Sequence, residues 1–249
     1  MPINYTHTEE IHNTTSANEV LPHVFGIFHP RSVIDVGCGT GSWLSVAKQS
    51  NCQQILGIDG IDVGDNMRCI EKHEFIQHDL ATVFKPSDKF DMAICLEVAE
   101  HLPPEASDNV VSTLTDCADV ILFSAAVPGQ GGQWHVNEQW PAYWQQKFAS
   151  HNYVAVDALR SVFWDNEKVD WWYRQNMLLY VKQDIAAQLN LPVTDRLPIY
   201  IHQQLFEYRM KELEEANRFS AYLDDMVQKE IQQPRFFPTL KRLIKSIVK

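Results

Sequence analysis

The feature that most constrains the fold of this chain is an apolar segment that runs directly into three closely spaced glycines, in the sequence VIDVGCGTGSWL. The apolar residues 33–36 predict a buried β-strand, and Gly37, Gly39 and Gly41 separate it from a helical segment that follows Ser42. Glycines permit a tight turn and a close approach of the backbone to a ligand, because a Cβ atom there would clash. This order predicts an α/β protein with a ligand-binding loop after its first strand.

Short apolar runs alternate with longer amphipathic segments along most of the chain. The runs SVIDVG, QILGID, EFIQHD, FDMAICLE and DVILFSA each predict a buried strand, and helix-like spacers separate most of them. Farther along, YVAVDAL and QNMLLYVK are candidates for two closing strands. This order is typical of a parallel sheet covered by helices on both faces.

Size and composition fit one globular domain with additional helices. The chain has 249 residues, of which 45% are hydrophobic, and this is enough to bury one substantial core. It has no apolar run of about eighteen residues and no signal-peptide layout at its beginning, so we expect a cytoplasmic protein. A formal net charge of −11 argues against a protein that binds mainly by neutralising nucleic-acid phosphates.

The cysteines predict reduced thiols. They are odd in number, form no C-x-x-C pair and in part lie inside apolar runs, which argues against a disulfide framework and against a zinc site. The five residues are Cys38, Cys52, Cys69, Cys95 and Cys117.

An acidic residue ends the second predicted strand. Asp59 lies about twenty residues beyond the glycine turn, where a carboxylate can accept hydrogen bonds from both hydroxyls of a ribose. The G-x-G-x-G spacing differs from the G-x-G-x-x-G of dinucleotide-binding proteins, and Asp35 lies in the strand before the turn. A dinucleotide-binding oxidoreductase is the alternative, and the short glycine spacing disfavours it.

At VIDVGCGTG the sequence resembles the first motif of class I S-adenosylmethionine-dependent methyltransferases almost residue for residue. The resemblance extends over roughly residues 20–182. It implies an α/β fold with a Rossmann-like seven-stranded sheet, a last strand that is antiparallel, helices on both faces and a C-terminal helical extension. It also implies that Asp35 and the glycine turn lie near the amino-acid part of S-adenosylmethionine, that Asp59 holds the ribose and that Asp79 lies by the adenine. Cys38 is then a turn residue and not a nucleophile. The residues expected to bind the cofactor are Asp35, Gly37, Cys38, Gly39, Gly41, Asp59, Gly60, His78, Asp79, Leu80 and Leu96.

A second group of polar residues follows the fourth predicted strand in CLEVAEHLPPE. One helical turn would bring Glu97, Glu100 and His101 to one side, and His135 follows the fifth strand in a glycine-rich loop. These four residues are the candidate metal ligands, and a set rich in carboxylate oxygen and without a thiolate suits Mg²⁺ or Mn²⁺ better than zinc. Two alternatives stay open. In the first, the run is an acidic helix start that binds no metal. In the second, His101 or His135 acts as a general base without a metal.

The E-x-x-E-H run is similar to two branches of the same family, the quinone-pathway O-methyltransferases and the small-RNA 3′-terminal 2′-O-methyltransferases. The second resemblance implies a metal ion that binds two neighbouring ribose hydroxyls. The loop PGQGGQWHVNEQW resembles bacterial methyltransferases associated with surface polysaccharides. Its aromatic and polar side chains suit a sugar ring or a base, and the substrate candidates are Gln133, Trp134, Asn137 and Glu138.

The pattern changes near residue 197, where the strand signal ends. A rough three-four spacing of Phe206, Leu213, Ala216, Leu223 and Val227 predicts one long helix. This helix either lies against its own domain or pairs with a second copy or another partner, and Arg209 and Ser220, which interrupt the seam, favour the first. We expect three parts: a helical lead-in over residues 1–30, a methyltransferase domain over 31–185 and a C-terminal extension over 186–249.

The last residues, 235–249, contain five basic side chains and no acid, and their apolar residues share one helical face. We expect this tail to contact either an anionic membrane surface, at the inner face of the membrane, or an acidic partner. A solvated basic tail is the alternative.

Together these observations predict an S-adenosylmethionine-dependent O-methyltransferase that acts on a sugar hydroxyl of a bacterial glycan or glycosylated metabolite with the help of a divalent metal. Glu97, His101 and His135 are the candidate catalytic residues. RNA 3′-terminal ribose methylation is a second hypothesis, which the net acidity disfavours. A cofactor-binding assembly protein without catalysis is a third.

Overall fold

A computed structural model of the protein describes residues 13–232. The contacts divide the chain into two units, the first ending at His202 and the second beginning at Gln203. This division lies later than the predicted boundary at residue 185. The segment after that residue belongs to the first unit because Leu197 is buried in its core and Arg160 donates a hydrogen bond to the carbonyl of Pro198.

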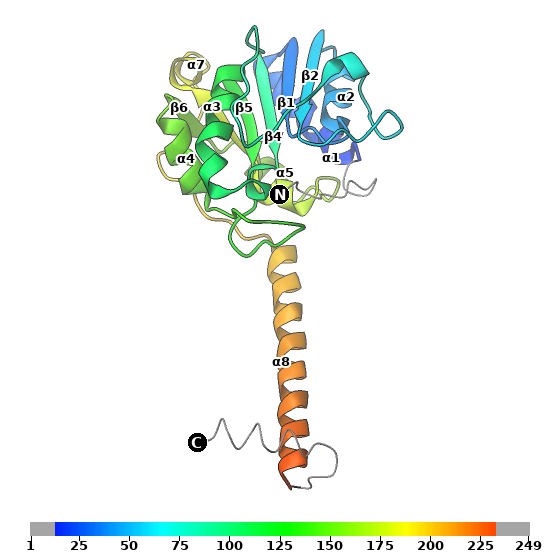
Figure 1. The fold of residues 1–249 in the computed structure, drawn as a ribbon. Coiled ribbons are helices and arrows are strands. Elements are labelled where there is room, and N and C mark those ends of the chain that lie inside the picture. The colour runs from blue at the N-terminus through cyan, green and yellow to red at the C-terminus, as the bar shows by residue number, and fades with distance from the viewer. Residues whose placement is uncertain (1–12, 233–249) are drawn as a thin grey trace. The chain divides into compact units, whose positions relative to one another are not determined.

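The first unit contains the predicted seven-stranded sheet, with strand order β3-β2-β1-β4-β5-β7-β6 (Figure 1). All neighbouring strands are parallel except β7, which runs antiparallel to both β5 and β6. This confirms the predicted fold, including its antiparallel last strand. The strands are β1 (Ser32–Val36), β2 (Gln54–Asp59), β3 (Phe75–Gln77), β4 (Met92–Leu96), β5 (Val120–Ser124), β6 (Tyr153–Val156) and β7 (Leu178–Lys182).

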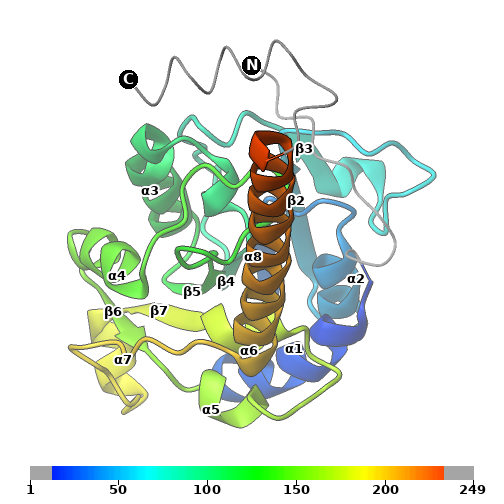
Figure 2. The same cartoon turned by 90° about the horizontal axis from the view of Figure 1, so that it is seen from below.

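Helices cover both faces of the sheet (Figure 2). On one face Leu21 and Leu44 bring α1 and α2 against the sheet, and on the other Leu114 and Phe148 bring α3 and α4 against it. The helices of the first unit are α1 (Thr15–Phe28), α2 (Ser42–Gln49), α3 (Ser107–Cys117), α4 (Pro141–Ala149), α5 (Arg160–Phe163), α6 (Trp171–Asn176) and α7 (Gln183–Gln188). Short 3-10 helices span Lys72–Glu74, Ala99–His101 and Pro104–Ala106. The alternation of apolar runs and spacers therefore predicted the layers correctly.

All the cysteines are free thiols, as expected, and only Cys69 is exposed. The four others lie in the core, where they fill space like small apolar side chains.

The second unit begins with α8 (Gln203–Gln232), a single uninterrupted helix that confirms the predicted long helix. Whether α8 pairs with a partner stays a prediction. The basic tail, residues 235–249, lies outside the described residues. Within residues 13–232, no helix is both long and apolar enough to span a membrane.

An aromatic stack joins α4 to the antiparallel strand β7, and a mutation in it tests how the helix packs on the sheet. Phe148 is fully buried, and its ring stacks on that of Tyr180 in β7 with the centroids 3.9 Å apart. We predict that Phe148→Ala lowers the free energy of unfolding by about 3–5 kcal/mol, because it leaves a cavity between helix and sheet. The half-exposed Val162 supplies the control, and Val162→Ala should change stability by less than about 0.5 kcal/mol. Urea denaturation followed by fluorescence measures both, and equal midpoints would contradict this account of the core.

Candidate active site

The glycine turn after β1 is held against the end of β2. The backbone N–H groups of Gly37 and Cys38 both donate to the carbonyl of Ile58, at 2.7 and 3.2 Å. Gly37 has a φ of +85°, and a Cβ atom built on it would lie 2.4 Å from Cγ2 of Val98. The turn therefore requires glycine at this position for both its conformation and its close packing.

The acid that ends β2 is tied to the same turn. Asp59 accepts hydrogen bonds from the backbone N–H of Gly39 and from that of Ile61, both at 2.9 Å. These two bonds fix the carboxylate beside the turn, which is the position predicted for a ribose-binding acid. Asp59 is only partly buried, so a ligand can reach it.

Burial shapes the chemistry of the strand residues beside the turn. It raises the pKa of Asp35 to about 8, and the negative charge of Asp59 adds to this shift. Burial, followed by the charges of Asp35 and Asp59, raises the pKa of the Cys38 thiol well above its ordinary value. A neutral buried thiol is a poor nucleophile, which agrees with the prediction that Cys38 is a turn residue.

The remaining predicted cofactor residues lie at the same edge of the sheet, at the ends of β2, β3 and β4. The backbone N–H of His78 donates to the carbonyl of Asp59 at 2.8 Å, and Asp79 accepts from the backbone N–H of Ala81 at 3.0 Å. Leu96 is the last residue of β4. The structure thus brings together the residues predicted from the sequence at the carboxyl ends of four neighbouring strands, where α/β proteins bind their ligands. The roles of all these residues in cofactor binding stay predictions.

A second cluster lies where β4 and β5 end. Each of Glu100, His101 and His135 offers a ligand atom, and these atoms all lie within 4.8 Å of one another. The Glu100 side chain is fully buried, and the Glu97 carboxyl and the backbone N–H groups of Glu100 and Ala126 approach it without forming a well-aligned hydrogen bond. Burying an ionised carboxylate costs free energy unless a positive charge or hydrogen-bond donors lie beside it. A bound divalent cation would supply that charge, so the cluster fits one.

Burial shifts the pKa values of two side chains in this cluster. Burial and the neighbouring Glu97 charge raise the pKa of Glu100 well above its ordinary value. Burial, with His135 close by, lowers the pKa of His101 to about 4. At neutral pH His101 is therefore an uncharged imidazole, which can bind a metal but is a weak base for removing a proton.

The glycine-rich loop after β5 is fastened to this cluster from both sides. The backbone N–H groups of Val136 and Asn137 donate to the carbonyl of Glu100, at 2.9 and 3.0 Å. Glu138 accepts from the backbone N–H of Gly129 and Gly131, and its Oε1 lies 2.9 Å from Nδ1 of His135. The loop therefore holds His135 in a fixed orientation, as carboxylate partners do in metal sites.

The substrate candidates on this loop separate into two kinds. Gln133 and Trp134 are exposed, Trp134 by 61%, and they stay candidates for substrate contact. Asn137, the third substrate candidate, is not exposed. Its side chain is buried and donates to the carbonyl of Ala99 and the hydroxyl of Ser107, because the loop folds back over the 3-10 helices. Glu138 is engaged with His135 and with the loop backbone, and its role in substrate binding stays a prediction.

Glu97 does not join Glu100 and the two histidines in the compact cluster. The prediction placed all three residues of the run on one helical turn, but helical geometry begins only at Ala99, and Glu97 has a φ of +54°. Its carboxylate instead accepts hydrogen bonds from the side-chain amides of Gln130 at 2.7 Å and Asn176 at 3.1 Å. Sequence reasoning missed both amides. For Asn176 the available signal was the polar pair at residues 175–176, one residue away from the apolar β7.

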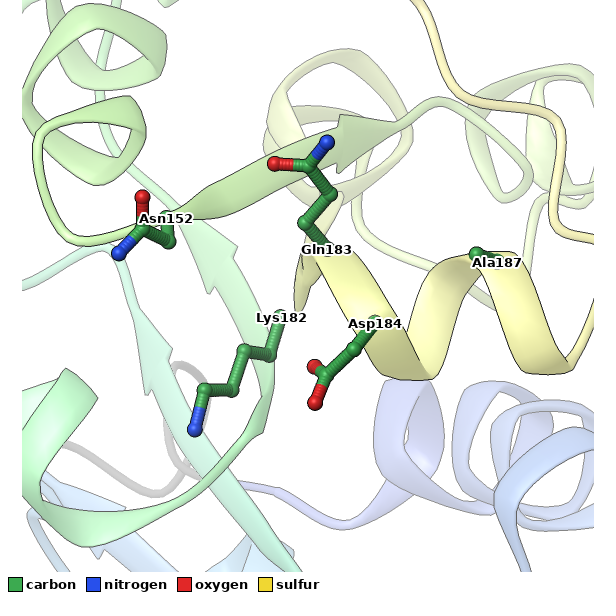
Figure 3. Close-up of a pocket in the computed structure, with 5 residues that line it drawn as sticks. All are labelled: Asn152, Lys182, Gln183, Asp184 and Ala187. Carbon is green, nitrogen blue, oxygen red and sulfur yellow. The ribbon is translucent and has the colours of Figure 1, made fainter.

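A hollow of about 430 Å³ lies away from these clusters, beside the end of β7 and the beginning of α7 (Figure 3). β7 runs antiparallel to β5 and ends where β5 begins, so this hollow lies at the opposite edge of the sheet. Its lining residues are Asn152, Lys182, Gln183, Asp184 and Ala187. None of them was predicted to bind cofactor, metal or substrate.

Comparison with known proteins gives a family match. The profile of a family described as a methyltransferase domain matches residues 12–168. The chain is also similar to the ubiquinone biosynthesis O-methyltransferase of Stutzerimonas stutzeri (strain A1501), with 27% identity over 105 residues. That match covers 38% of this chain and 44% of the enzyme, so the chain spans less than half the length of this curated relative.

One solved structure supports the same fold. The small RNA methyltransferase HEN1 superimposes with a TM-score of 0.50 at 14% identity, covering 68% of this chain and 25% of that chain. The magnesium protoporphyrin IX methyltransferase of Synechocystis PCC 6803 with bound SAM gives a TM-score of 0.47 at 18% identity, covering 69% of this chain and 80% of that chain. At these identities the likeness concerns the fold alone.

The position of Asp59 gives a binding prediction. Asp59→Ala should weaken binding of S-adenosylhomocysteine about 10- to 100-fold, because charge-assisted hydrogen bonds of about 1.5–3 kcal/mol are lost. The control is Asp88→Ala, at an exposed aspartate of a different loop, which should bind as the wild type does. Isothermal titration calorimetry measures both, and unchanged affinity in Asp59→Ala would disprove the ribose assignment.

The raised pKa of Asp35 gives a stability prediction for the ligand-free protein. Between its unfolded pKa of about 4 and a folded pKa of about 8, the folded chain keeps a proton that the unfolded chain has lost. The free energy of unfolding therefore falls as pH rises through this window, by at most about 1.4 kcal/mol per pH unit from this group. Asp35→Asn should lose this contribution, so its stability should fall less than that of the wild type between about pH 5.5 and about pH 7.5. Urea denaturation at the two pH values measures the difference, and identical pH dependence would refute the shift.

Proposed function

Since the chain belongs to the methyltransferase domain family, we propose that it transfers a methyl group from S-adenosylmethionine to a hydroxyl of a sugar, with a divalent cation at the acceptor. The sugar is part of a bacterial glycan or of a glycosylated metabolite. The observation that carries this proposal is the buried Glu100 carboxylate, which lies beside His101 and His135 and lacks a well-formed hydrogen bond.

In this proposal one group of residues binds the cofactor and a neighbouring group binds the cation and the acceptor. The glycine turn and Asp59 bind and orient the cofactor at the ends of β1 and β2. Gly37 packs against Val98, one residue after Glu97, so the cofactor turn directly contacts the segment that carries the second cluster. This contact supports transfer between ligands held in adjacent positions, because a fixed orientation replaces the entropy cost of an encounter.

Glu100, His101 and His135 would hold Mg²⁺ or Mn²⁺, with His101 neutral and His135 oriented by Glu138. When bound, the cation supplies a Lewis acid that lowers the pKa of an acceptor hydroxyl. The low pKa of His101 argues against this residue as the proton acceptor in a metal-independent mechanism.

Two observations support an oxygen acceptor on a sugar. The exposed Trp134 ring lies next to His135 in the chain, and aromatic rings with polar neighbours suit the faces of sugars. The similar enzyme of Stutzerimonas stutzeri is named an O-methyltransferase.

The proposal predicts a saturable Mn²⁺ site that depends on Glu100. Glu100→Gln should raise the Mn²⁺ dissociation constant at least about tenfold, while S-adenosylhomocysteine still binds. Wild-type affinity should increase with pH, because Glu100 must lose its proton to bind the cation and its pKa is raised. Calorimetric titration of chelator-treated protein at several pH values tests both points. Glu105→Gln, at an exposed glutamate of the next 3-10 helix, is the control.

Activity is tested by transfer of a labelled methyl group to crude glycan, lipid and RNA fractions, with and without chelator. Label in the glycan fraction that disappears with chelator and in Glu100→Gln supports the proposal. Full activity in chelator would refute the role of the metal, and label in RNA would refute the glycan acceptor.

A further inference from the structure

Glu97 is held in a conformation that a glutamate does not adopt by itself. Its φ of +54° lies in the left-handed region, which is strained for a residue with a Cβ atom. Its backbone N–H donates to both the carbonyl and the hydroxyl of Ser124, at 3.0 and 3.1 Å. Such a conformation persists only where the surroundings hold it, so the contacts of the Glu97 side chain need an account.

Both carboxylate oxygens of Glu97 accept hydrogen bonds from amides. Oε2 accepts from Nε2 of Gln130, in the loop after β5, and Oε1 accepts from Nδ2 of Asn176, at the end of α6. Gln130, Gln175 and Asn176 are all buried. Burying a carboxylate and three amides costs free energy unless each polar atom has a hydrogen-bond partner. Here the four side chains are hydrogen-bonded to one another.

A backbone N–H group at His202 determines which way these amides are turned. The backbone N–H of His202 donates to Oε1 of Gln175 at 2.7 Å. A backbone N–H can only donate, so this atom of Gln175 must be its oxygen, and the Gln175 nitrogen must face inward. It donates there to the side-chain oxygens of Gln130 at 3.3 Å and Asn176 at 3.0 Å.

A second backbone donor fixes the same direction. The N–H of Val127 points at Oε1 of Gln130, at 3.4 Å, and Asn176 also donates to this oxygen at 2.8 Å. With their oxygens committed to these donors, Gln130 and Asn176 can turn only N–H groups toward Glu97. The network therefore presents donors, and only donors, to the Glu97 carboxylate.

We propose that Gln130 and Asn176, oriented through Gln175, are positioning residues that fix the Glu97 carboxylate as a hydrogen-bond acceptor beside the Glu100, His101 and His135 cluster. The inference rests on the proposed function, since it treats Glu97 as part of the site that receives the acceptor. It adds two residues that lie 33 and 79 positions from Glu97 in the chain. The Glu97 side chain in turn contacts the carboxyl of Glu100, so the two amides act on a candidate metal ligand through Glu97, as outer partners of metal ligands do.

The first experiment compares Asn176→Leu with Asn166→Leu. Asn166 also donates its amide to a glutamate, Glu19, but away from the cluster, so the control loses the same kind of bond. Asn176→Leu should raise the Mn²⁺ dissociation constant about 10- to 100-fold, the usual effect of losing an outer partner, with unchanged affinity for S-adenosylhomocysteine. Asn166→Leu should change neither constant. Wild-type Mn²⁺ affinity in a folded Asn176→Leu protein would overturn the proposal.

If Asn176→Leu does not fold, Gln130→Met takes its place. The control is then Gln139→Met in the same loop, whose amide donates to Asn137 rather than to Glu97. The same rise in the Mn²⁺ dissociation constant is expected in Gln130→Met alone, and an unchanged constant overturns the proposal.

A second experiment needs no metal and so separates this inference from the proposed function. In ¹⁵N-labelled protein, the side-chain NH₂ signals of Gln130 and Asn176 should exchange slowly with solvent and should shift in Glu97→Gln but not in Glu105→Gln. Such shifts in a protein that binds no Mn²⁺ would support the positioning role and refute only the metal. Signals that exchange fast and do not respond to Glu97→Gln would overturn the positioning role.

Discussion

The close contact between Gly37 and Val98 is the constraint on which the site depends. A side chain at Gly37 would overlap Val98, so the turn after β1 and the segment after β4 can meet only because one of them lacks a Cβ atom. This contact sets the distance between the residues assigned to the cofactor and those assigned to the acceptor. The hydrogen bonds from the turn to Ile58 and Asp59 fix the turn itself, so the spacing of the two parts of the site depends on Gly37.

The sequence predicted the layers of the fold because each layer repeats a local pattern. Apolar runs such as residues 33–36 and 92–96 identify buried strands without knowledge of their neighbours, and the glycine turn and Asp59 follow from their positions at strand ends. The contacts divide the chain after residue 202 and not at the predicted residue 185, because the segment between these positions lacks such a local pattern. The segment that contains Leu197 has no regular period, and its attachment to the first unit depends on contacts with distant residues such as Arg160.

The details of the candidate site were harder to predict because they depend on tertiary contacts. The prediction of a helical turn over the E-x-x-E-H run grouped Glu97 with Glu100 and His101. Glu97 instead has a positive φ, and its carboxylate is hydrogen-bonded to the side-chain amides of Gln130 and Asn176. Asn137 had the sequence surroundings of an exposed loop residue, yet it is buried because its loop folds over the 3-10 helices. In both cases the deciding partners lie more than 25 residues away, beyond the range of any local pattern.

The antiparallel direction of β7 has a consequence for the order in which the site is completed during synthesis. Because β7 is reversed, Asn176, two residues before the strand begins, lies at the edge where the parallel strands end, next to Glu97. A nascent chain that has emerged only as far as β6 already contains the glycine turn, Asp59 and the Glu100 cluster. It contains Gln130 but lacks Asn176, the second amide that holds Glu97, so this part of the site is completed by one of the last segments of the first unit to leave the ribosome.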